Sequence, residues 1–283
     1  MDVTFWGVRG SIPSPGPFTV RYGGNTPCVS VRLENDELFI LDLGTGARNL
    51  GTSLFTGPFG KGQGRATVLL SHAHWDHIQG FPFFGPFYVQ GNHFTVVGQT
   101  RGEQLLDRVL ERQMAAQFFP VQTYRNMGAT IDMRGLSDEG DLKIGGARIS
   151  ATLIPHGGTQ VLAFRIEAEG KILVYASDAG YDKNGPTPDA LALFQGADLL
   201  IHDSTFTPED RAQRLDRGLS SLEEAVQAAF QAQVKRLALF HYDQDYTDND
   251  VDQLVARGRR LLDDKGAHDL AILGAAEGLT LHL

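Results

Sequence analysis

Four side chains that can bind a metal ion lie within six residues of the chain. His72, His74, Asp76 and His77 directly follow the short apolar run from Thr67 to Leu70. If the chain stays extended through His72 and His74, both imidazoles point to the same side of the strand. A turn after them can bring Asp76 and His77 towards a second ion. The cluster therefore predicts two neighbouring metal sites.

The residue types in this cluster indicate hydrolytic chemistry. Imidazole nitrogens and carboxylate oxygens suit zinc, manganese or iron, and the single cysteine, Cys28, excludes a thiolate-rich structural zinc site. Two ions about 3.5 to 4 Å apart can bind a hydroxide between them, lower the pKa of its parent water and hold a phosphoryl or carbonyl oxygen. We therefore expect two divalent metal ions, with zinc as the first choice and manganese or iron as alternatives.

Further polar residues follow apolar runs that read as buried strands. His156 follows Ile149 to Ile154, Asp178 follows Ile172 to Tyr175, His202 and Asp203 follow Leu199 to Ile201, and His241 follows Leu237 to Phe240. Helical periodicity over Glu103 to Gln117 and Ser221 to Gln233 separates some of these runs. Two more strands are expected over Cys28 to Leu33 and Glu37 to Leu43, around a turn at Asn35-Asp36. This alternation indicates a layered α/β enzyme with its site at one edge of its sheets.

The segment from His72 to His77 resembles the metallo-β-lactamase superfamily, whose signature is His-x-His-x-Asp-His after a strand. The resemblance spans nearly the whole chain and implies one domain over residues 1–283, folded as a four-layered αβ/βα sandwich. It also implies a ligand set. The first metal would be held by His72, His74 and His156, and the second by Asp76, His77 and His241, with Asp178 bridging both.

Other segments resemble the phosphodiesterase branch of that superfamily, which contains ribonuclease Z, cyclic-nucleotide phosphodiesterases and the cyclic-phosphate diesterase of phosphonate breakdown. They are Gly7 to Ser11, Tyr22 to Thr26, Ile40 to Gly46 and Leu200 to Thr205. The thioesterase and lactonase branches usually carry a Thr-Pro-Gly-His type segment at the third histidine, whereas this chain has Ile154-Pro155-His156-Gly157. A phosphodiesterase is therefore favoured, and an ester, thioester or lactone hydrolase is the alternative.

Two departures from ribonuclease Z bear on the substrate. Where that enzyme and its near relatives have a Gly-His motif, this chain has Gly218-Leu219-Ser220-Ser221, and it lacks a long Gly-rich basic insertion of the kind that grips transfer RNA. The formal net charge of -9 also disfavours extended nucleic acid. We therefore expect a small phosphodiester substrate, with cyclic nucleotides among the candidates. Cleavage at the 3' end of transfer RNA precursors is the alternative.

Roles are expected for several individual residues. Asp76 would orient the attacking water or accept its proton, and His202 would protonate the leaving group or, equally, hold a loop in place. Arg9, in its Gly-rich turn, is the candidate for binding the substrate phosphate. Asp203 would support a ligand histidine or only cap a turn. Asp42 would lie buried beside the ligands.

The aromatic run from Phe81 to Tyr88 follows the metal cluster directly. It could wall a pocket in which a nucleobase stacks, but packing in the core or at a dimer contact is the favoured explanation. The chain has no apolar run long enough to span a bilayer, and its start, Met1-Asp2-Val3-Thr4, is unlike a secretory signal. We therefore expect a cytoplasmic enzyme without a membrane partner. A homodimer is common in the branch that the chain resembles.

Overall fold

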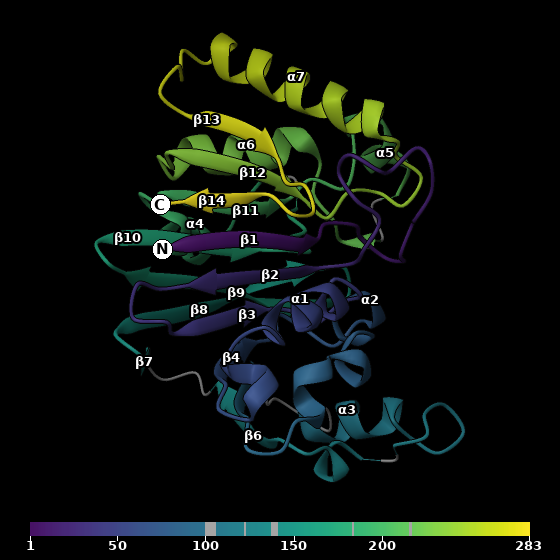
Figure 1. The fold of residues 1–283 in the computed structure, drawn as a ribbon. Coiled ribbons are helices and arrows are strands. Elements are labelled where there is room, and N and C mark those ends of the chain that lie inside the picture. The colour runs from purple at the N-terminus through teal and green to yellow at the C-terminus, as the bar shows by residue number, and fades with distance from the viewer. Residues whose placement is uncertain (100–105, 122, 137–140, 183, 215–216) are drawn as a thin grey trace.

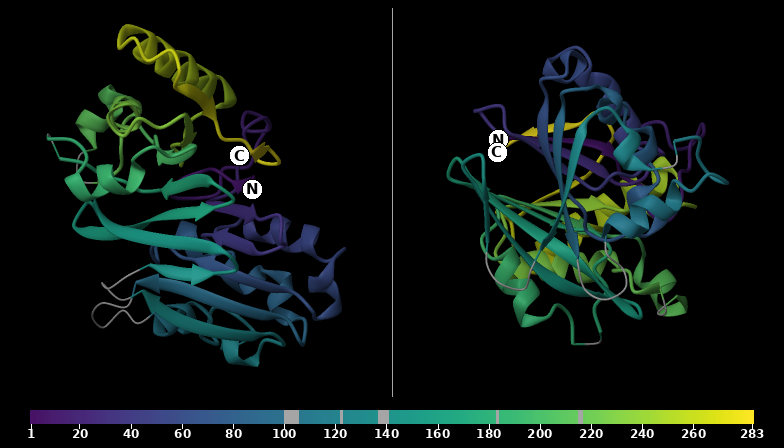
Figure 2. Two further views of the ribbon diagram at one scale, coloured as in Figure 1. Left: turned by 90° about the vertical axis from the view of Figure 1, so that its left-hand side faces the viewer. Right: turned by 90° about the horizontal axis from the view of Figure 1, so that it is seen from below.

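The computed structural model describes residues 1–99, 106–121, 123–136, 141–182, 184–214 and 217–283. Its framework consists of two seven-stranded sheets packed face to face, with helices on their outer sides (Figure 1). This arrangement confirms the predicted α/β class and the layered αβ/βα sandwich. The two ends of the described chain lie side by side (Figure 2), because the last strand pairs with the first.

The first sheet is built from the N-terminal half of the chain and closed by the last strand. Its strands β3 to β6 run parallel, and the remaining neighbours are antiparallel. In spatial order they are β14 (Thr280–His282), β1 (Asp2–Gly7), β2 (Cys28–Arg32), β3 (Leu38–Leu41), β4 (Arg65–Leu69), β5 (His93–Gln99) and β6 (Thr130–Leu136).

The second sheet follows in the C-terminal half. Strands β10 to β13 run parallel, whereas β7, β8, β9 and β10 form an antiparallel meander. In spatial order they are β13 (Ala271–Gly274), β12 (Arg236–Phe240), β11 (Leu199–Asp203), β10 (Lys171–Ala176), β9 (Thr159–Ala168), β8 (Ala147–His156) and β7 (Leu142–Ile144). All seven expected strands are confirmed, and each observed end lies within two residues of the expected one.

Two cores hold the layers together. Phe39 and Leu41 of β3 face the second sheet, whereas Leu38 and Ile40 face the helices, as the alternation of side chains along a strand requires. Between the sheets, the rings of Phe5 and Phe240 lie 6.2 Å apart. Both faces of the central strands are therefore buried, and this explains why they read as continuous apolar runs.

The outer helices form two groups, and each group covers one sheet. In Figure 1, α7 lies at the top beside β13, and α3 lies at the opposite end of the molecule. Helices α1 (Ala47–Leu54), α2 (Trp75–Ile78) and α3 (Leu106–Gln113) belong to the first sheet, and α4 (Pro188–Phe194), α5 (Pro208–Gln213), α6 (Leu222–Gln231) and α7 (Asp248–Asp264) to the second. None of the described helices has the length and apolar character needed to cross a bilayer.

The helix predictions were correct for α6 and partly correct for α3. Ser221 caps α6 and forms a capping box with Glu224, so the predicted start is confirmed. The helix expected to reach Gln117 ends at Gln113, and residues 103–105 of that prediction lie outside the described part of the chain. Helix α7 was not predicted, although its cap at Thr247 precedes a regular apolar face.

The aromatic run after the metal cluster divides between core and surface. Phe81, Phe84 and Phe87 are fully buried beneath the first sheet, and Phe87 packs edge to face on Phe94 of β5. Phe83 is 60% exposed. Packing in the core, the favoured explanation for this run, is therefore confirmed for the three buried rings.

Replacing Thr247 with alanine tests the cap of α7. The Thr247 Oγ1 accepts the N–H of Asp250, and losing this bond should lower the free energy of unfolding by about 1 kcal/mol. Thr52→Ala is the matched control, because Thr52 lies exposed inside α1, where alanine is the better helix former. Urea denaturation measures both variants, and an equal loss in the two would contradict the capping role.

Candidate dinuclear metal site

The seven predicted ligands lie together at one edge of the sandwich. Strands β8, β10 and β12 of the second sheet run in the same direction, so their carboxyl ends meet there, beside the end of β4 in the first sheet. Their ligand atoms form two groups, each within 4.8 Å: His72, His74, His156 and Asp178, and Asp76, His77, Asp178 and His241.

Asp178 belongs to both groups, with one carboxylate oxygen facing each. Its Oδ1 lies 3.9 Å from His72 Nε2 and 3.8 Å from His156 Nε2. Its Oδ2 lies 3.0 Å from His77 Nε2 and 3.3 Å from His241 Nε2. A carboxylate in this position can bridge two cations.

The spacing in the second group matches the spacing of ligands around a zinc ion. Ligands about 2.0 to 2.1 Å from a tetrahedral zinc lie about 3.3 Å from one another. Asp76 Oδ2 is 3.3 Å from His77 Nε2 and 3.2 Å from His241 Nε2. The donor atoms of this group are therefore already placed around one point.

Two donor nitrogens in the site also lack an ordinary role. His72 Nε2 and His77 Nε2 are buried and make no geometrically good hydrogen bond among the described residues, although His77 Nε2 lies 3.0 Å from Asp178 Oδ2 and 3.3 Å from Asp76 Oδ2. A buried imidazole nitrogen without a partner costs free energy, and binding a cation through its lone pair removes that cost. The residues present therefore fit a pair of divalent ions.

A buried carboxylate behind the second group orients its histidine. Asp42, which follows β3, accepts a 2.7 Å hydrogen bond from His77 Nδ1 and another of 2.7 Å from the Tyr175 hydroxyl. The backbone N–H and hydroxyl of Ser71 also donate to it. With its Nδ1 proton held in this way, His77 turns Nε2 towards the carboxylates of Asp76 and Asp178, as a histidine that binds a metal would. The expected buried place of Asp42 beside the ligands is confirmed.

Two other histidines of the site, His156 and His241, are oriented in the same manner. His156 Nδ1 donates to the carbonyl of Gly218 at 2.8 Å. His241 Nδ1 lies 2.9 Å from Thr205 Oγ1, and Asp203 Oδ1 accepts both the N–H and the hydroxyl of Thr205. Asp203 therefore does both things expected of it, because it caps the turn and, through Thr205, supports His241.

The N-terminal Gly-rich turn forms part of the wall of this site. The Ser11 N–H donates to Asp76 Oδ2 at 2.8 Å. Gly10 lies against the ring of His241, so that a Cβ at this position would be 2.4 Å from the ring carbon Cε1. Any side chain at Gly10 would push His241 out of place, which explains a glycine here.

The structure corrects the prediction that Arg9 binds the substrate phosphate. Arg9 is fully buried, and its guanidinium donates to the backbone carbonyls of Gly23, Asp243 and Tyr246. Burial also lowers the pKa of Arg9 from its ordinary value. Arg9 therefore ties the N-terminal turn to the loop after β12, and its enclosed guanidinium is not exposed to a substrate in solvent.

Four residues in this region have left-handed backbone conformations although they are not glycine. Their φ angles are 67° at Ser11, 59° at Asp42, 55° at Asp178 and 60° at His241. Such conformations cost free energy and persist where the surrounding structure enforces them, often at functional sites. At Asp178 and His241 they turn the chain sharply at the end of a strand, where the side chain meets the other ligands.

The electrostatics of the second group favour a cation. Burial alone would lower the pKa of His77, but nearby carboxylates, with Asp178 and Asp76 the strongest, raise it well above its usual range. Burial would likewise raise the pKa of Asp178, but the imidazoles of His241 and His77 hold it well below its usual range. The carboxylates are thus ionised, and they create a negative environment in which positive charge is stabilised.

His202 was expected either to protonate the leaving group or to hold a loop in place, and its surroundings weigh against the first role. Its side chain is fully buried, with Nδ1 at 2.7 Å from the Asp203 carbonyl and Nε2 at 2.6 Å from the Tyr181 hydroxyl. Burial lowers the pKa of His202 to about 4, so the ring is neutral at pH 7. These contacts support the other expected role, in which His202 holds the neighbouring loop in place.

Leu219 is buried where the resembled enzymes have a histidine. On either side of it, the Gly218 carbonyl accepts from His156, and the Ser220 N–H donates to Asp203 Oδ2. The loop therefore keeps its structural contacts with the site through its backbone, and the Leu219 side chain supplies no proton-transferring group.

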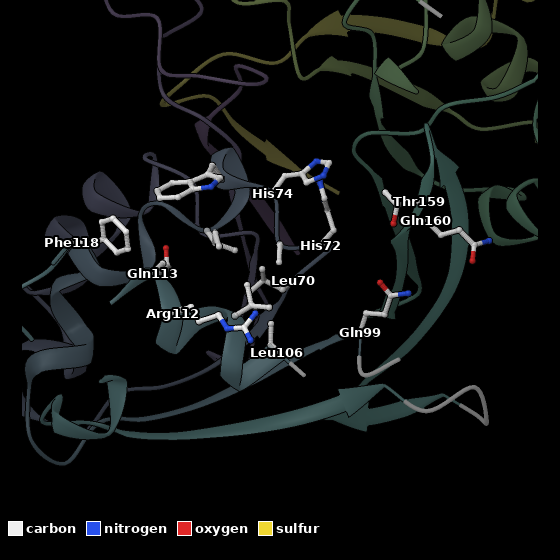
Figure 3. A pocket seen from close by; sticks show the side chains of 14 residues that line it. Leu70, His72, His74, Gln99, Leu106, Arg112, Gln113, Phe118, Thr159 and Gln160 are labelled. Carbon is white, nitrogen blue, oxygen red and sulfur yellow. The ribbon is translucent and has the colours of Figure 1, made fainter. Parts of the chain in front are cut away.

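The site opens into a cavity of about 530 Å³ on the side of His72 and His74. Figure 3 shows His72 and His74 at one end, Gln113 and Phe118 on one side, and Gln99, Thr159 and Gln160 on the other. Of the proposed ligands, His74 is the exposed one. A substrate would therefore reach the metals from this side. Sequence reasoning did not identify Trp75 or Phe118, which also line this cavity.

Comparison with known families identifies the chain. The model of the β-lactamase superfamily domain matches residues 48–242, which is well over half of the chain and includes all seven predicted ligands. This protein therefore belongs to the metallo-β-lactamase superfamily, and it is a metal-dependent hydrolase.

Relatives of this chain include ribonucleases. The chain is 24% identical to ribonuclease BN of Cronobacter sakazakii over 297 aligned positions, which cover 90% of this chain and 93% of the relative. It is 38% identical to ribonuclease Z of Ignicoccus hospitalis over 85 positions, but these cover only 30% of this chain and 27% of that enzyme. These matches support the phosphodiesterase branch of the superfamily.

Solved structures show the same fold over the whole chain. The metallo-β-lactamase fold protein YhfI of Bacillus subtilis superposes with a TM-score of 0.70 at 19% identity, covering 99% of this chain and 98% of that one. The short form of human tRNase Z superposes with a TM-score of 0.66 at 20% identity, covering 100% of this chain and 99% of that one. At such identities the likeness establishes the architecture alone.

Asp42→Asn tests how the second group is oriented. Asparagine has the same size and tolerates the left-handed φ of 59°, but its amide group cannot accept all the hydrogen bonds that converge on Asp42. We expect the affinity for zinc to fall about 10 to 100-fold, measured by competition with a chromophoric chelator. Asp2→Asn, an exposed position at the start of β1 that pairs with His282, is the matched control and should leave affinity unchanged. Equal affinity in both variants would rule out this role for Asp42.

His202→Gln tests the neutral, buried state of His202. The pKa of about 4 in the folded protein lies below the ordinary value of 6.5, so the unfolded chain binds the proton more tightly. The stabilisation is complete above pH 6.5 and is lost as the pH falls towards 4. Between pH 7 and pH 5 the wild type should lose about 2 kcal/mol more unfolding free energy than the variant. Parallel urea titrations at the two pH values measure this difference, and identical pH dependence would show that His202 is not the group involved.

Proposed function

We propose that this hydrolase is a phosphodiesterase that uses two divalent metal ions to cleave small phosphodiesters. The observation that carries the proposal is the Asp178 carboxylate, which faces one group of histidines with each oxygen. Two cations bridged in this way suit the in-line displacement at phosphorus, where the attacking and leaving oxygens both need stabilisation. The ribonuclease names of the relatives support the same bond type.

The proposed ligand assignment follows the two groups. His72, His74 and His156 would hold the first ion, and Asp76, His77 and His241 the second, with Asp178 shared. Five imidazoles and two carboxylates favour zinc, with manganese or iron as alternatives. When bound, the ions would activate a water molecule for attack and neutralise the charge that develops on the phosphoryl oxygens.

The side chains around the ions have separate tasks in this proposal. Neighbouring imidazoles hold the pKa of Asp76 below its ordinary value although the group is buried. Its ionised carboxylate, fixed by the Ser11 N–H on Oδ2, can orient the attacking water or accept its proton. His202 is neutral and enclosed, so the leaving group would take its proton from solvent that enters through the cavity beside His74.

A small substrate suits the cavity better than transfer RNA. The names of the relatives favour a polynucleotide substrate and weigh against our expectation from sequence that extended nucleic acid is disfavoured. However, a cavity of about 530 Å³ lies in the range of small-molecule sites, and the net charge of -9 opposes binding of a long polyanion. The proposal therefore keeps the small phosphodiester, with transfer RNA precursors as the competing substrate.

Removal and return of metal test the proposal. Protein stripped by a chelator should lose at least about 100-fold of its activity on bis-p-nitrophenyl phosphate, and zinc or manganese should restore it at about two ions per chain. Inductively coupled plasma mass spectrometry counts the ions in the same samples. Full activity with less than one ion per chain would exclude a two-metal mechanism.

Substrate panels separate the alternatives. We expect cleavage of 2',3'-cyclic or 3',5'-cyclic nucleotides or of dinucleotides to exceed cleavage of p-nitrophenyl acetate and of a transfer RNA precursor. Cleavage of the ester alone would favour the carboxylic ester, thioester or lactone hydrolase. Cleavage of the precursor alone would favour the transfer RNA processing enzyme. Light scattering of the same preparation shows whether the chain forms the homodimer that is common in the resembled branch.

A further inference from the structure

Two large aromatic side chains at the mouth of the site are exposed to solvent. Trp75, between the ligands His74 and Asp76, is 67% exposed, and Phe118, after α3, is 66% exposed. Both line the cavity that leads to His72 and His74. Neither ring belongs to the two cores. Exposed aromatic rings at the mouth of a cavity commonly mark a place where a ligand binds.

The same rings also border a second cavity. It measures about 550 Å³ and includes Trp75, Gln113 and Phe118 together with Phe83 and Phe119, whose rings meet edge to face at 5.3 Å. Trp75, Gln113 and Phe118 are thus shared by both cavities. They form a threshold between the end that carries the proposed metal ligands and an aromatic area outside it. We call these three residues the aromatic threshold.

A polar group without a partner lies in the aromatic threshold. Gln113 Nε2 is buried and has no hydrogen-bond partner within the part of the chain that the structure describes. A buried amide donor without a partner costs free energy, and because Gln113 lines both cavities, a rotation of its side chain would let an acceptor on a ligand satisfy this donor. The threshold therefore offers ring faces for stacking and one amide donor. A planar heterocycle with acceptor atoms on its edge complements this combination.

Resting on the proposed function, we infer that the substrate's phosphodiester carries a heterocyclic ring of the nucleobase type, which stacks on Trp75 and Phe118 and accepts a hydrogen bond from Gln113. The phosphodiester would then lie at the His72 and His74 end of the cavity, where these ligands line it. In Figure 3, Gln113 and Phe118 lie together on the side of the cavity away from Gln99, Thr159 and Gln160. Trp75, Gln113 and Phe118 would thus determine specificity without taking part in the reaction.

A nucleobase explains these features better than a simple alkyl group does. An alkyl group would cover the rings but leave the Gln113 donor without an acceptor. Base stacking on aromatic side chains tolerates any base, because every base has a π face. The threshold would therefore select for the presence of a base, with modest preference among bases.

Tryptophan fluorescence tests the stacking independently of catalysis. The chain has two tryptophans, and the other one, Trp6, hydrogen-bonds to Ser30 from β1. In a Trp6→Phe variant treated with a chelator, emission therefore comes from Trp75 alone. Adenosine 5'-monophosphate should quench it in a saturable manner after correction for absorbance, whereas ribose 5-phosphate should not. No saturable quenching, or equal quenching by both, would overturn the inference.

Kinetics test the selectivity on two matched five-membered cyclic phosphodiesters. 2',3'-Cyclic AMP carries a base, whereas glycerol 1,2-cyclic phosphate has no ring other than the phosphodiester itself. In Trp75→Ala and in Phe118→Ala, the ratio of KM for 2',3'-cyclic AMP to KM for glycerol 1,2-cyclic phosphate should rise about 10-fold over its value in the wild type. Trp75→Phe should restore most of the selectivity because it keeps an aromatic face. A parallel change on both substrates in both alanine variants would overturn the inference.

Controls separate this inference from the proposed function. Phe230→Ala removes another partly exposed aromatic ring, on α6, which packs on Lys265 and lines neither cavity, so both KM values should stay unchanged. The metal content of each variant is measured because Trp75 adjoins two proposed ligands. If the metal-loaded wild type hydrolyses neither compound, the proposed function fails, and the fluorescence titration still decides the stacking. If it hydrolyses both with equal KM, the proposed function stands and the inference fails.

Discussion

The Asp178 carboxylate lies between two groups of imidazoles, and the site depends on keeping it there. A buried ionised carboxylate is costly unless positive charge surrounds it, and here each oxygen has its own set of donor nitrogens within 3.9 Å. The left-handed φ of 55° turns Asp178 into this position at the end of β10. The same geometry makes the group suitable for bridging two divalent ions.

The sandwich provides the rigidity that this arrangement requires. The ligands come from the ends of strands in two different sheets, and the core between the sheets fixes their relative positions. Each sheet also contributes an orienting carboxylate, Asp42 from the first and Asp203 from the second. The N-terminal turn closes the site through Gly10 and Ser11, while the buried Arg9 anchors that turn. Stability and function are therefore coupled at this edge of the molecule.

The two ends of the site differ in burial and in the kind of side chain that lines them. The second group is buried, whereas His74 is exposed and adjoins the cavity. Charge thus concentrates at the enclosed end, and apolar rings with amide groups line the open end. A phosphodiester attached to a planar ring combines the same two properties. The charged end would therefore carry out the proposed reaction, and the aromatic end, which consists of different residues, would determine the proposed specificity.

The residue types of the proposed ligands, the strands that they follow and the layered class of the fold could all be predicted from the sequence alone. These are local features, because apolar runs define buried strands and the motif from His72 to His77 is contiguous. The tertiary structure decided what Arg9 and His202 do, since burial and backbone contacts, which no local pattern records, remove both from the reacting groups. It also brought Trp75 and Phe118 to one cavity from segments far apart in the chain. Residue type indicates what a side chain can do, but its neighbours in space decide whether a substrate can reach it.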